Sequence, residues 1–408
     1  MGDAYILDGV RTPRGRGKAT GSLHGIHPQH LLAQVLDTLV ERGLDPHVVD
    51  EVVVGNSSNQ GDHGHSIGRL AVLAANWPYT TPGYTLNRYC GSALQAVAVA
   101  SMGVRSGEQD LVVAGGVESM SRWPAPAGSG AIDGANPALH DKYPLVPQGI
   151  SADLIATQRG YTREQLDGWA VMSQQRAATA LREDRFARSI VPVRDDSGAI
   201  VLRADEFVRE GTTREGLAAL RPSFEALGAR VPPGRTTSFD EAALSAYPEV
   251  GAVRHLHHAG NSSGVVDGAA ALVVAGEDHV RDNGLTPRAR IVSSATVGCD
   301  PVIMLSAPAP AARKALRKAG MSIKDIDLWE INEAFAAVAL ETSELLGLDP
   351  GVVNVNGGAI ALGHPIGATG VMLVQTVLDE LERTDRTTGL VTMCTGGGMA
   401  VATVIERV

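Results

Sequence analysis

The sequence predicts an α/β fold made of two copies of one α/β unit, with a loop-rich domain inserted into the first copy. Apolar strands alternate with amphipathic helices toward both ends of the 408-residue chain. A segment near the start recurs near the end with the same internal spacing. Between Glu118 and about His255 the composition changes to Pro, Gly, Arg and Asp. This change marks the inserted domain.

The first half opens with a strand, a helix and a second strand. Residues 5–7 form a short apolar run, and a loop rich in Gly and Arg follows up to residue 25. Residues 28–42 have helical spacing of apolar side chains, and residues 48–55 read as a buried β-branched strand. The helical positions are Leu31, Leu32, Val35, Leu36, Leu39 and Val40.

A helix that is apolar on all sides follows, and a cysteine stands at its start. The stretch is NRYCGSALQAVAVA, residues 87–100, with Cys90 just before small residues. A thiol there faces unpaired N–H groups and the positive end of the helix dipole. The dipole changes a thiol pKa of about 8.5 by only about one unit, so a nucleophilic Cys90 needs a base from elsewhere. A packed core cysteine is the alternative interpretation. A strand at residues 110–114 comes next and runs into two glycines.

The inserted domain covers residues 119–255, and its best-formed helix is expected at residues 162–182. The stretch AGNSSGVVDG then forms a glycine-rich turn that leads into an apolar strand at residues 269–275. We therefore divide the chain into a first half, residues 1–285, which contains the insertion, and a second half, residues 286–408.

The repeat supports this division. The segment GLDPHVVDEVVVGN starts at Gly43, and GMSIKDIDLWEINE starts 277 residues later at Gly320. Both halves then supply a helix start of small residues and a strand that ends in glycines. Two units related by a pseudo-twofold axis explain the pattern, and equivalent loops of both units are expected to meet at one site.

Two loops of the second half carry polar residues at such positions. In WEINEAFA, residues 329–336, a strand delivers Asn332 and Glu333 to a helix start. A helix N-cap is the alternative role for Asn332. In NVNGGAIALGHPIGATG, residues 354–370, glycines flank His364 on both sides just before another helix. A buried core histidine is the usual alternative, but the glycines indicate close approach of another group.

A further loop lies at residues 391–398, VTMCTGGG. Cys394 closes an apolar strand there, and the glycines after it can present successive backbone N–H groups as an anion nest.

Composition argues against several functions. The chain has 35 Lys and Arg against 45 Asp and Glu, a net charge of −10, which disfavours nonspecific binding of nucleic acid or an anionic membrane. It has no basic leader and no run of about 18 apolar residues, so we expect a cytoplasmic protein without membrane insertion. Three cysteines make no disulfide framework. The glycine motifs of nicotinamide-binding and P-loop proteins are absent from the expected places.

Two histidine groups raise the question of a metal. His63 and His65 have no further ligand at a useful spacing. For His255, His257 and His258 a solvated or coenzyme-facing loop is the favoured interpretation and a metal the alternative. We therefore expect no metal site.

Together the motifs resemble the thiolases, acyl-CoA C-acyltransferases that make or cleave 3-oxoacyl-CoA. The resemblance rests on NRYCGSALQA, WEINEAFA, NGGAIALGHPIGATG and MCTGGG, in the family's order, with AGNSSGVVDGAAA between them, and it covers almost the whole chain. It implies the thiolase fold, with two fused halves of five-stranded mixed sheets around buried helices. It also implies acyl-CoA and coenzyme A as substrates and no cofactor.

The resemblance also implies residue roles. Cys90 is similar to the acylated nucleophile of the family. His364 is similar to the base that activates it and then donates a hydrogen bond to the substrate oxygen. Cys394 is similar to the second acid/base, which protonates the departing acetyl-CoA carbanion and later deprotonates coenzyme A.

The remaining implied residues bind oxyanions or the coenzyme. Asn332 is expected to hold a water that forms one oxyanion hole with His364. The backbone N–H groups of Cys90 and Gly396 are expected to form the other. Ser263 matches the position that contacts the pantetheine arm of coenzyme A. The resemblance thus implies a covalent intermediate and ping-pong kinetics.

Three departures from the family pattern concern specificity. Ala93 stands where many thiolases have glycine, and Pro147 and Gln148 precede Gly149 where a His-Met pair is common. The segment at residues 222–259 is longer than in simple acetoacetyl-CoA thiolases. With PQGISADLIAT, it resembles thiolases of actinobacterial pathways that degrade bulky or ring-bearing acyl-CoAs.

Three functional hypotheses follow from the resemblance. The first is thiolytic cleavage of a 3-oxoacyl-CoA with a medium-chain or bulky acyl group. The second is biosynthetic condensation of two acetyl-CoA, and the third is a noncatalytic relative that binds CoA esters or lipids. The resemblance further implies a homodimer or homotetramer, with the loop before Cys90 near the subunit contact.

Overall fold

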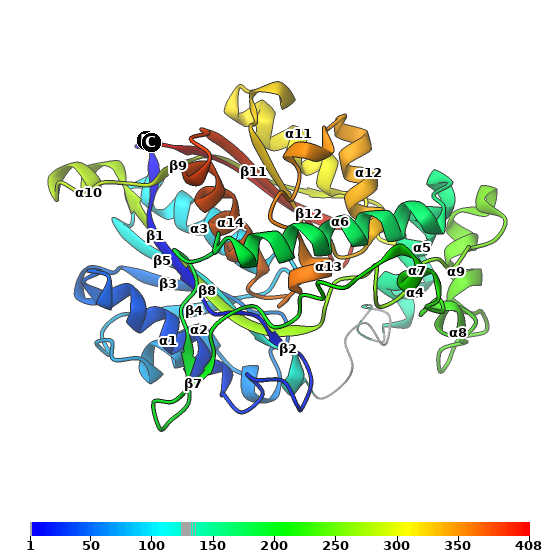
Figure 1. Cartoon of the computed structure of the whole chain (residues 1–408), viewed down its shortest axis with the longest axis horizontal. Coiled ribbons are helices and arrows are strands. Elements are labelled where there is room, and N and C mark those ends of the chain that lie inside the picture. Colours follow the sequence, from blue (N-terminus) through cyan, green and yellow to red (C-terminus); the bar gives the residue numbers. More distant parts are fainter. Residues whose placement is uncertain (1, 124–131, 133, 135) are drawn as a thin grey trace.

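One long mixed β-sheet runs through both halves of the molecule (Figure 1). The computed structural model describes residues 2–123, 132, 134 and 136–408. Within them the strand order is β10-β11-β12-β9-β1-β8-β5-β3-β4, and the short β2 (Gly15–Arg16) pairs with β8. The strands of the first half are β1 (Ala4–Arg11), β3 (Glu51–Gly55), β4 (Gly83–Leu86), β5 (Leu111–Ser119) and β8 (Val266–Gly276). Those of the second half are β9 (Ala289–Gly298), β10 (Leu328–Ile331), β11 (Thr388–Thr395) and β12 (Met399–Arg407).

The two halves use the same strand order, as the repeat predicted. In the first half five strands run β4-β3-β5-β8-β1, and in the second β10-β11-β12-β9 repeats this order without an equivalent of β4. A single parallel bridge between Trp329 and Val353 stands in the place of that fifth strand. The halves join where Tyr5 and Ile6 of β1 pair with Arg290 and Ala289 of β9. The fold class is therefore confirmed, although the second half keeps only a trace of its fifth strand.

The 277-residue offset of the repeat also holds for the secondary-structure elements. The 3₁₀ turn η1 (Pro46–Val48) and the turn η5 (Ile323–Asp325) lie 277 residues apart and introduce β3 and β10 respectively. Because residues 46–48 form this turn, the strand expected from residue 48 begins only at Glu51. The expected strand at residues 110–114 likewise extends to Ser119, because its glycines stay paired with β8.

The helices form layers on the sheet. Helices α3 (Ser92–Ser106) and α14 (Thr369–Arg383) lie side by side between the two halves and share one hydrophobic cluster with both sheet portions. Helices α1 (Pro28–Glu41) and α2 (Ile67–Ala74) cover the outer face of the first half. Helices α11 (Pro308–Ala319) and α12 (Ala336–Leu346) cover that of the second. The helix after Cys90 is mostly buried, as expected.

Glycines let the starts of α3 and α14 touch backbone to backbone. A Cβ atom on Gly370 would lie 2.1 Å from the backbone nitrogen of Leu94. One on Gly116 would lie 2.2 Å from the Gly367 carbonyl oxygen, and one on Gly55 would lie 2.4 Å from the backbone nitrogen of Ala93. No side chain fits at such separations, because packed interiors leave no room for an added methyl group. The loops of the two halves therefore meet at this crossing.

The inserted domain leaves the sheet after β5 and returns before β8. Its helices are α4 (Pro137–Lys142), α5 (Gln148–Arg159), α6 (Arg163–Arg182), α7 (Arg214–Ala218), α8 (Glu225–Gly228) and α9 (Phe239–Ala246). Helices α5, α8 and α9 extend to one end of the molecule, whereas the hairpin of the domain, β6 (Val193–Arg194) and β7 (Ile200–Leu202), lies beside α1 (Figure 1). Thr162 caps α6 with a capping box that Gln165 completes. Helices α5 and α6 pack on α12.

The remaining regular elements are short helices and 3₁₀ turns. They are α10 (Glu277–Asp282), α13 (Ala359–Leu362), η2 (Gly61–His63), η3 (Met120–Arg122), η4 (Pro248–Val250) and η6 (Pro350–Val352). Among the described residues, no helix is both long enough and apolar enough to cross a membrane.

Replacing Gly370 by alanine should destabilise the chain. The new methyl group would lie 2.1 Å from backbone at Leu94, which cannot turn away as a side chain can. We expect a loss of about 3 kcal/mol in the free energy of unfolding, measured by urea denaturation. Gly25→Ala is the control, because nothing lies within 4 Å of a Cβ atom there. Equal urea midpoints for the two variants would show that the crossing is not tightly packed.

Candidate active site

Cys90 lies in a turn that immediately precedes α3. The Ser92 hydroxyl fixes this turn, because it accepts a hydrogen bond from the Arg88 N–H (2.8 Å) and donates one to the Tyr89 carbonyl (2.6 Å). Tyr89 adopts a positive φ of 49°. Cys90 is 3% exposed. The turn therefore holds the sulfur inside the protein at the foot of a helix.

The surroundings of Cys90 disfavour its thiolate. Burial raises the pKa of this thiol to about 11, although hydrogen bonds from the Gln148 side chain, the Gly396 N–H and its own N–H oppose the rise. The charge of the Glu118 carboxylate adds to the rise. Below that pH the thiol keeps its proton, so a base must remove it before the sulfur can attack.

The loop after β11 lies against the Cys90 turn. A Cβ atom on Gly91 would lie 2.6 Å from Thr395 Cγ2, and one on Gly396 would lie 3.2 Å from Tyr89 Cγ. Small residues on both sides thus allow the Gly396 N–H to reach the Cys90 sulfur. The structure brings together Cys90 and Gly396, which are far apart in the sequence.

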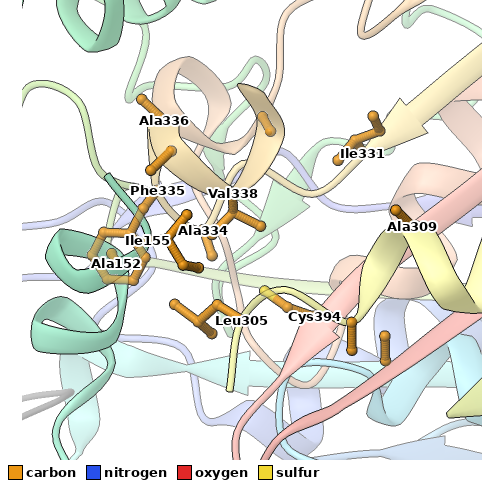
Figure 2. Packing of buried hydrophobic residues seen from close by; sticks show 14 of the residues in the cluster. Ala152, Ile155, Leu305, Ala309, Ile331, Ala334, Phe335, Ala336, Val338 and Cys394 are labelled. Atoms are coloured by element: carbon orange, nitrogen blue, oxygen red, sulfur yellow. The ribbon is translucent and has the colours of Figure 1, made fainter. Parts of the chain in front are cut away.

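Cys394 closes β11 beside this contact. Its side chain is fully buried, and Figure 2 shows it in the apolar cluster that also contains Leu305, Ala334 and Val338. Burial raises the pKa of the Cys394 thiol well above its usual range, and charge on nearby Cys90 raises it further. Both thiols are therefore protonated in the resting protein. They lie close enough for a charge on Cys90 to raise the pKa of Cys394.

His364 is buried in a defined tautomer. The Thr369 hydroxyl donates its single proton to the Pro365 carbonyl (2.9 Å), so the 2.6 Å contact with His364 Nδ1 requires the ring to donate. Nε2 is then free of a proton and is the basic nitrogen. Burial, and next the charge of Arg14, lower the pKa of His364 to about 3. The imidazole is neutral at any ordinary pH.

Asn332 lies beside the basic nitrogen of His364. Its Nδ2 is 3.4 Å from His364 Nε2, and its Oδ1 is buried without a hydrogen-bond partner in the described part of the chain. The alternative role as a helix N-cap is wrong, because α12 begins after Phe335. An unpartnered buried acceptor is costly, so Asn332 Oδ1 is available to a donor in the site.

Ser263 lies at the edge of the same group. Its N–H donates to the Ala334 carbonyl (2.9 Å), two residues after Asn332, and the neighbouring Gly264 carbonyl accepts from the His364 N–H (2.8 Å). The Ser263 side chain is partly exposed. The sequence stretch that carries Ser263 is thus fixed to two of the expected site loops.

Two buried carboxylates hold the site loops, and sequence reasoning missed this role. Glu333 accepts from the Trp169 indole (2.9 Å), the Ser173 hydroxyl (2.7 Å), the Asn354 amide (3.0 Å) and the Ile360 N–H (3.1 Å). Trp169 and Ser173 belong to α6, Asn354 to the loop after η6, and Ile360 to α13. Glu333 therefore fixes the loop that carries its neighbour Asn332.

Glu118 has an equivalent set of donors in the first half. It accepts from the Trp123 indole (3.1 Å), the Ser57 hydroxyl (2.8 Å), the Asn56 amide (3.3 Å) and the Gly367 N–H (2.9 Å). The Gly367 contact ties the His364 loop to the first half. A Glu two residues after the glycines of a buried strand, in GGVE, was the only signal in the sequence.

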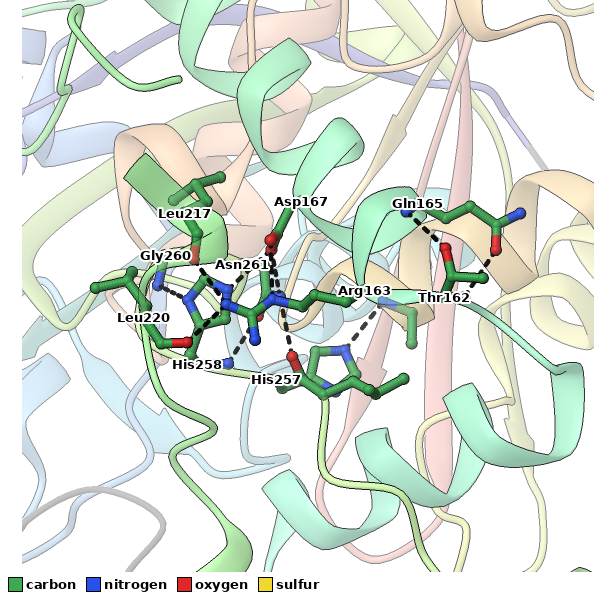
Figure 3. Close-up of polar contacts among 12 residues, drawn as sticks. Thr162, Arg163, Gln165, Asp167, Leu217, Leu220, His257, His258, Gly260 and Asn261 are labelled. Atoms are coloured by element: carbon green, nitrogen blue, oxygen red, sulfur yellow. Dashed lines mark hydrogen bonds and ion pairs between the residues drawn. The ribbon is translucent and has the colours of Figure 1, made fainter. Parts of the chain in front are cut away.

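The interpretation of His255, His257 and His258 as a solvated or coenzyme-facing loop is wrong, because these side chains pack against carboxylates and His257 and His258 are buried. His258 Nε2 lies 2.8 Å from Asp167 (Figure 3). His257 Nδ1 lies 2.7 Å from Asp153. Both ring nitrogens of His255 contact carboxylates, Asp153 at 2.9 Å and Asp240 at 3.0 Å. Burial by itself would lower the His255 pKa, but these two hydrogen bonds outweigh it and raise the pKa to about 10.

In the first half, His63 also has a hydrogen-bond partner. His63 Nε2 accepts a hydrogen bond from the Ser119 N–H at 2.8 Å. Across the described residues, no group of three or more His, Cys, Asp or Glu is arranged to hold a metal ion.

The arrangement combines two buried thiols, a neutral imidazole with a free nitrogen, and backbone donors from glycine-rich loops of both halves. Such a combination suits acyl transfer through a cysteine, because it supplies a nucleophile, a base and donors for an oxyanion. Fold and site together therefore define an acyltransferase built from two α/β halves.

The comparisons with known proteins agree. Residues 4–243 match the family description "Thiolase, N-terminal domain", and residues 285–407 match "Thiolase, C-terminal domain". The chain belongs to the thiolase family. Its two family domains span most of both predicted halves.

Several relatives match over the full chain. A beta-ketoadipyl-CoA thiolase of Acinetobacter baylyi is 40% identical, with 100% of both chains covered. The steroid 3-ketoacyl-CoA thiolase FadA6 of Mycobacterium tuberculosis is 40% identical and covers 100% of this chain and 95% of its own length. The crystal structure of the Bacillus anthracis acetyl-CoA acetyltransferase superposes with a TM-score of 0.83 at 36% identity, covering 100% and 99%.

Replacing Thr369 by valine should impair turnover. Valine has nearly the same shape but cannot accept the His364 Nδ1 proton, so the ring loses the contact that keeps Nε2 free. We expect kcat to fall about 10-fold or more, by analogy with the partners that orient metal-ligating histidines. Thr384→Val, at the other end of α14, is the control, because its hydroxyl contacts only the Glu380 carbonyl. Equal kcat values for the two variants would disprove the orienting role.

Proposed function

We propose that this chain cleaves 3-oxoacyl-CoA with coenzyme A by a ping-pong mechanism, through an acyl group on Cys90. The observation that carries the proposal is the close backbone approach of the loop after His364 to the start of α3, which follows Cys90. A Cβ atom on Gly55 would lie 2.4 Å from the Ala93 nitrogen and 2.7 Å from the Gly367 carbonyl oxygen. We propose that this approach brings the basic Nε2 of His364 to the Cys90 sulfur. Membership of the thiolase family supports the reaction class.

In the first half-reaction His364 Nε2 takes the proton of the Cys90 thiol. The thiolate attacks the 3-oxo carbon of the substrate, and the bond between C2 and C3 breaks. The acyl group stays on Cys90, while the electron pair stays on C2 of acetyl-CoA. Cys394, buried beside Cys90, protonates this carbanion, and acetyl-CoA leaves.

In the second half-reaction coenzyme A enters as the nucleophile. The Cys394 thiolate takes the proton from the CoA thiol, and the CoA sulfur attacks the acyl carbon. The bond to Cys90 breaks, acyl-CoA leaves, and the protonated His364 returns its proton to the Cys90 sulfur. The protein ends in its starting protonation state, with both thiols and the imidazole neutral as burial favours.

Hydrogen-bond donors stabilise the charge that develops on oxygen. The N–H groups of Cys90 and Gly396 form one oxyanion hole at the start of α3. His364 and a water on Asn332 form the second, and the buried Asn332 Oδ1, which lacks a partner among the described residues, supports this assignment. Each well-placed donor typically contributes about 3 to 4 kcal/mol to the transition state.

For the substrate we propose a medium-chain or bulky 3-oxoacyl-CoA. Relatives at about 40% identity include thiolases named for beta-ketoadipyl-CoA and for steroid 3-ketoacyl-CoA. Relatives named acetyl-CoA acetyltransferase are equally similar, for example that of Paracoccus denitrificans at 40%. Condensation of two acetyl-CoA is therefore the second candidate. A marked preference for acetoacetyl-CoA over longer 3-oxoacyl-CoAs in thiolysis assays would favour it.

Coenzyme A serves as a substrate, and no further cofactor takes part in this scheme. We propose that the partly exposed Ser263 contacts its pantetheine arm, because Ser263 adjoins the loops of Asn332 and His364. A Ser263→Ala variant with an unchanged KM for coenzyme A would contradict this contact. The free cysteines agree with a reducing cytoplasmic location.

The covalent mechanism predicts a burst. When the enzyme is mixed with a 3-oxoacyl-CoA but no coenzyme A, acetyl-CoA should be released once per active site, because the acyl group then stays on Cys90. Stopped reactions measure the acetyl-CoA, and mass spectrometry of digests locates the acyl group. We expect the added mass on the Cys90 peptide alone.

Variants give the controls for the burst. Cys90→Ala should show neither burst nor adduct, and Cys394→Ala should lose most of the burst rate because the carbanion lacks its proton donor. Cys299→Ala replaces the third free cysteine and should behave like the parent chain. A parent enzyme without any burst would instead support a noncatalytic CoA-ester-binding relative.

We also propose that the chain forms a homodimer through β4. This strand is an end of the sheet, and Tyr84 in it is 37% exposed. The turn before Cys90 follows β4 directly, so pairing of two β4 strands would lie close to the site.

Light scattering should therefore give a mass of two or four times 42.5 kDa. Tyr84→Asp should lower the mass, because a carboxylate would be buried between paired strands without a partner. Lys324→Asp, on the far half of the molecule, is the control. A parent chain that is monomeric at micromolar concentration would contradict the dimer.

A further inference from the structure

Strand β10 carries a carboxyl group, Glu330, into the core of the second half. Glu330 is 3% exposed, and its Oε2 is buried without a hydrogen-bond partner in the part of the chain that the structure describes. Leaving a buried polar atom unpaired is costly, whereas an apolar side chain of the same shape would avoid the cost. The carboxyl of Glu330 therefore has an oxygen to offer to a further polar group.

The alternation of side chains along β10 places Glu330 on the inner face of the sheet. Trp329 and Ile331 belong to the outer hydrophobic cluster, whereas Leu328 belongs to the cluster that the two halves share. Residues two apart in a strand lie on the same face, so Glu330 shares its face with Leu328. Helix α14, which follows His364, packs on β10 and contributes to the same shared cluster.

The same alternation brings Asn332 next to Glu330. The Asn332 N–H donates to the Thr392 carbonyl of β11 (3.1 Å), whereas the Ile331 N–H donates to Asn354 Oδ1 at the other edge of β10 (2.8 Å). The backbone therefore stays extended as far as Asn332, and Asn332 shares the inner face with Glu330. Alternate side chains of a strand begin about 6.6 Å apart, so the polar ends of these two can meet at one water molecule.

The two side chains are complementary as donor and acceptor. Burial raises the pKa of Glu330 well above its usual range, and the charge of Glu333 adds to the rise. Glu330 is thus a neutral acid with an O–H donor. Asn332 is 1% exposed, and its Oδ1 is a buried acceptor with no partner among the described residues. Asn332 Nδ2 lies 3.4 Å from His364 Nε2, so the pair adjoins the base of the site.

The other charged groups near Glu330 have partners of their own. Each of them makes a hydrogen bond or an ion pair with another residue. They come from the loop after β1, from α6, from the end of β10 and from α14, and they are Arg14, Arg176, Glu333 and Glu380. Glu330 differs from them because its Oε2 is left for a group that is not part of the chain.

We propose that Glu330 is a positioning residue for the second oxyanion hole, and that its protonated carboxyl donates to the water that Asn332 Oδ1 binds. The water then donates one hydrogen to Asn332 and keeps the other for the substrate oxygen. The inference rests on the proposed function, in which this water and His364 form the hole. Three hydrogen bonds are usual for a buried water, and a donor to its oxygen strengthens the bonds that it donates.

The first test needs no substrate. A crystal structure of the full-length parent chain should show a water within about 3.2 Å of both the Glu330 carboxyl and Asn332 Oδ1. The infrared spectrum of the parent at neutral pH should contain the carbonyl stretch of a protonated carboxyl group, and Glu330→Gln should lose that band. The water should remain in Glu330→Gln, because a carboxamide also offers a donor.

The second test compares variants in thiolysis assays. Glu330→Gln should keep kcat within about threefold of the parent, because it retains an uncharged donor. Glu330→Met keeps the length of the side chain without a donor, and we expect kcat to fall about 10-fold, toward the roughly 100-fold typical of a lost oxyanion donor. The KM for coenzyme A should not change. The melting temperature should not fall, because an apolar side chain replaces a buried polar one.

Leu328→Met is the matched control. Leu328 is buried on the same face of β10, two residues farther from Asn332, and the exchange nearly conserves volume. Its kcat should equal that of the parent.

Four outcomes would overturn the proposal. They are a crystal structure without a water between Glu330 and Asn332, a parent-like kcat for Glu330→Met, an equal loss of kcat in Glu330→Gln, and a loss in Glu330→Met that comes with a lower melting temperature. The third would mean that a charged carboxylate is needed, and the fourth that Glu330 only supports packing. The water and the infrared band need no CoA ester, so a chain that has both but gives no acetyl-CoA burst would contradict the proposed function alone.

Discussion

The backbone contact between the starts of α3 and α14 is the constraint on which the rest of the structure depends. Gly370, Gly116 and Gly55 leave no space for side chains there, so loops from the two halves meet directly. Cys90 precedes one of these helices and His364 the other. Hydrophobic burial brings the two halves together, but the missing Cβ atoms decide that they meet closely enough for chemistry.

Two carboxylates keep this crossing in register. Glu118 reaches across to the Gly367 N–H, and Glu333 gathers donors around the loop of Asn332. Burial raises the pKa of each, although several hydrogen bonds oppose the rise. Buried polar networks of this kind are stable only when nearly every member has a partner. They therefore fix the positions of the neighbouring residues as well as their own.

Burial also sets the resting state of the site. It raises the pKa of Cys90 to about 11 and lowers that of His364 to about 3, so neither group is charged at neutral pH. Charge separation between them is costly until a substrate supplies an oxygen that can share the negative charge. Donors on the sulfur, such as the Gly396 N–H, reduce this cost.

The sequence by itself determined the two-half α/β fold, because the 277-residue repeat and the apolar strand patterns are local features. It also indicated candidate site residues, namely Cys90, His364, Cys394 and Asn332, because each lies in a motif that resembles a thiolase motif. Only the tertiary structure decided that Glu118 accepts a hydrogen bond from the Gly367 N–H and that Glu333 accepts one from the Trp169 indole. Such partners come from segments separated in the chain, and their contacts depend on how side chains pack across an interface, which no local pattern encodes.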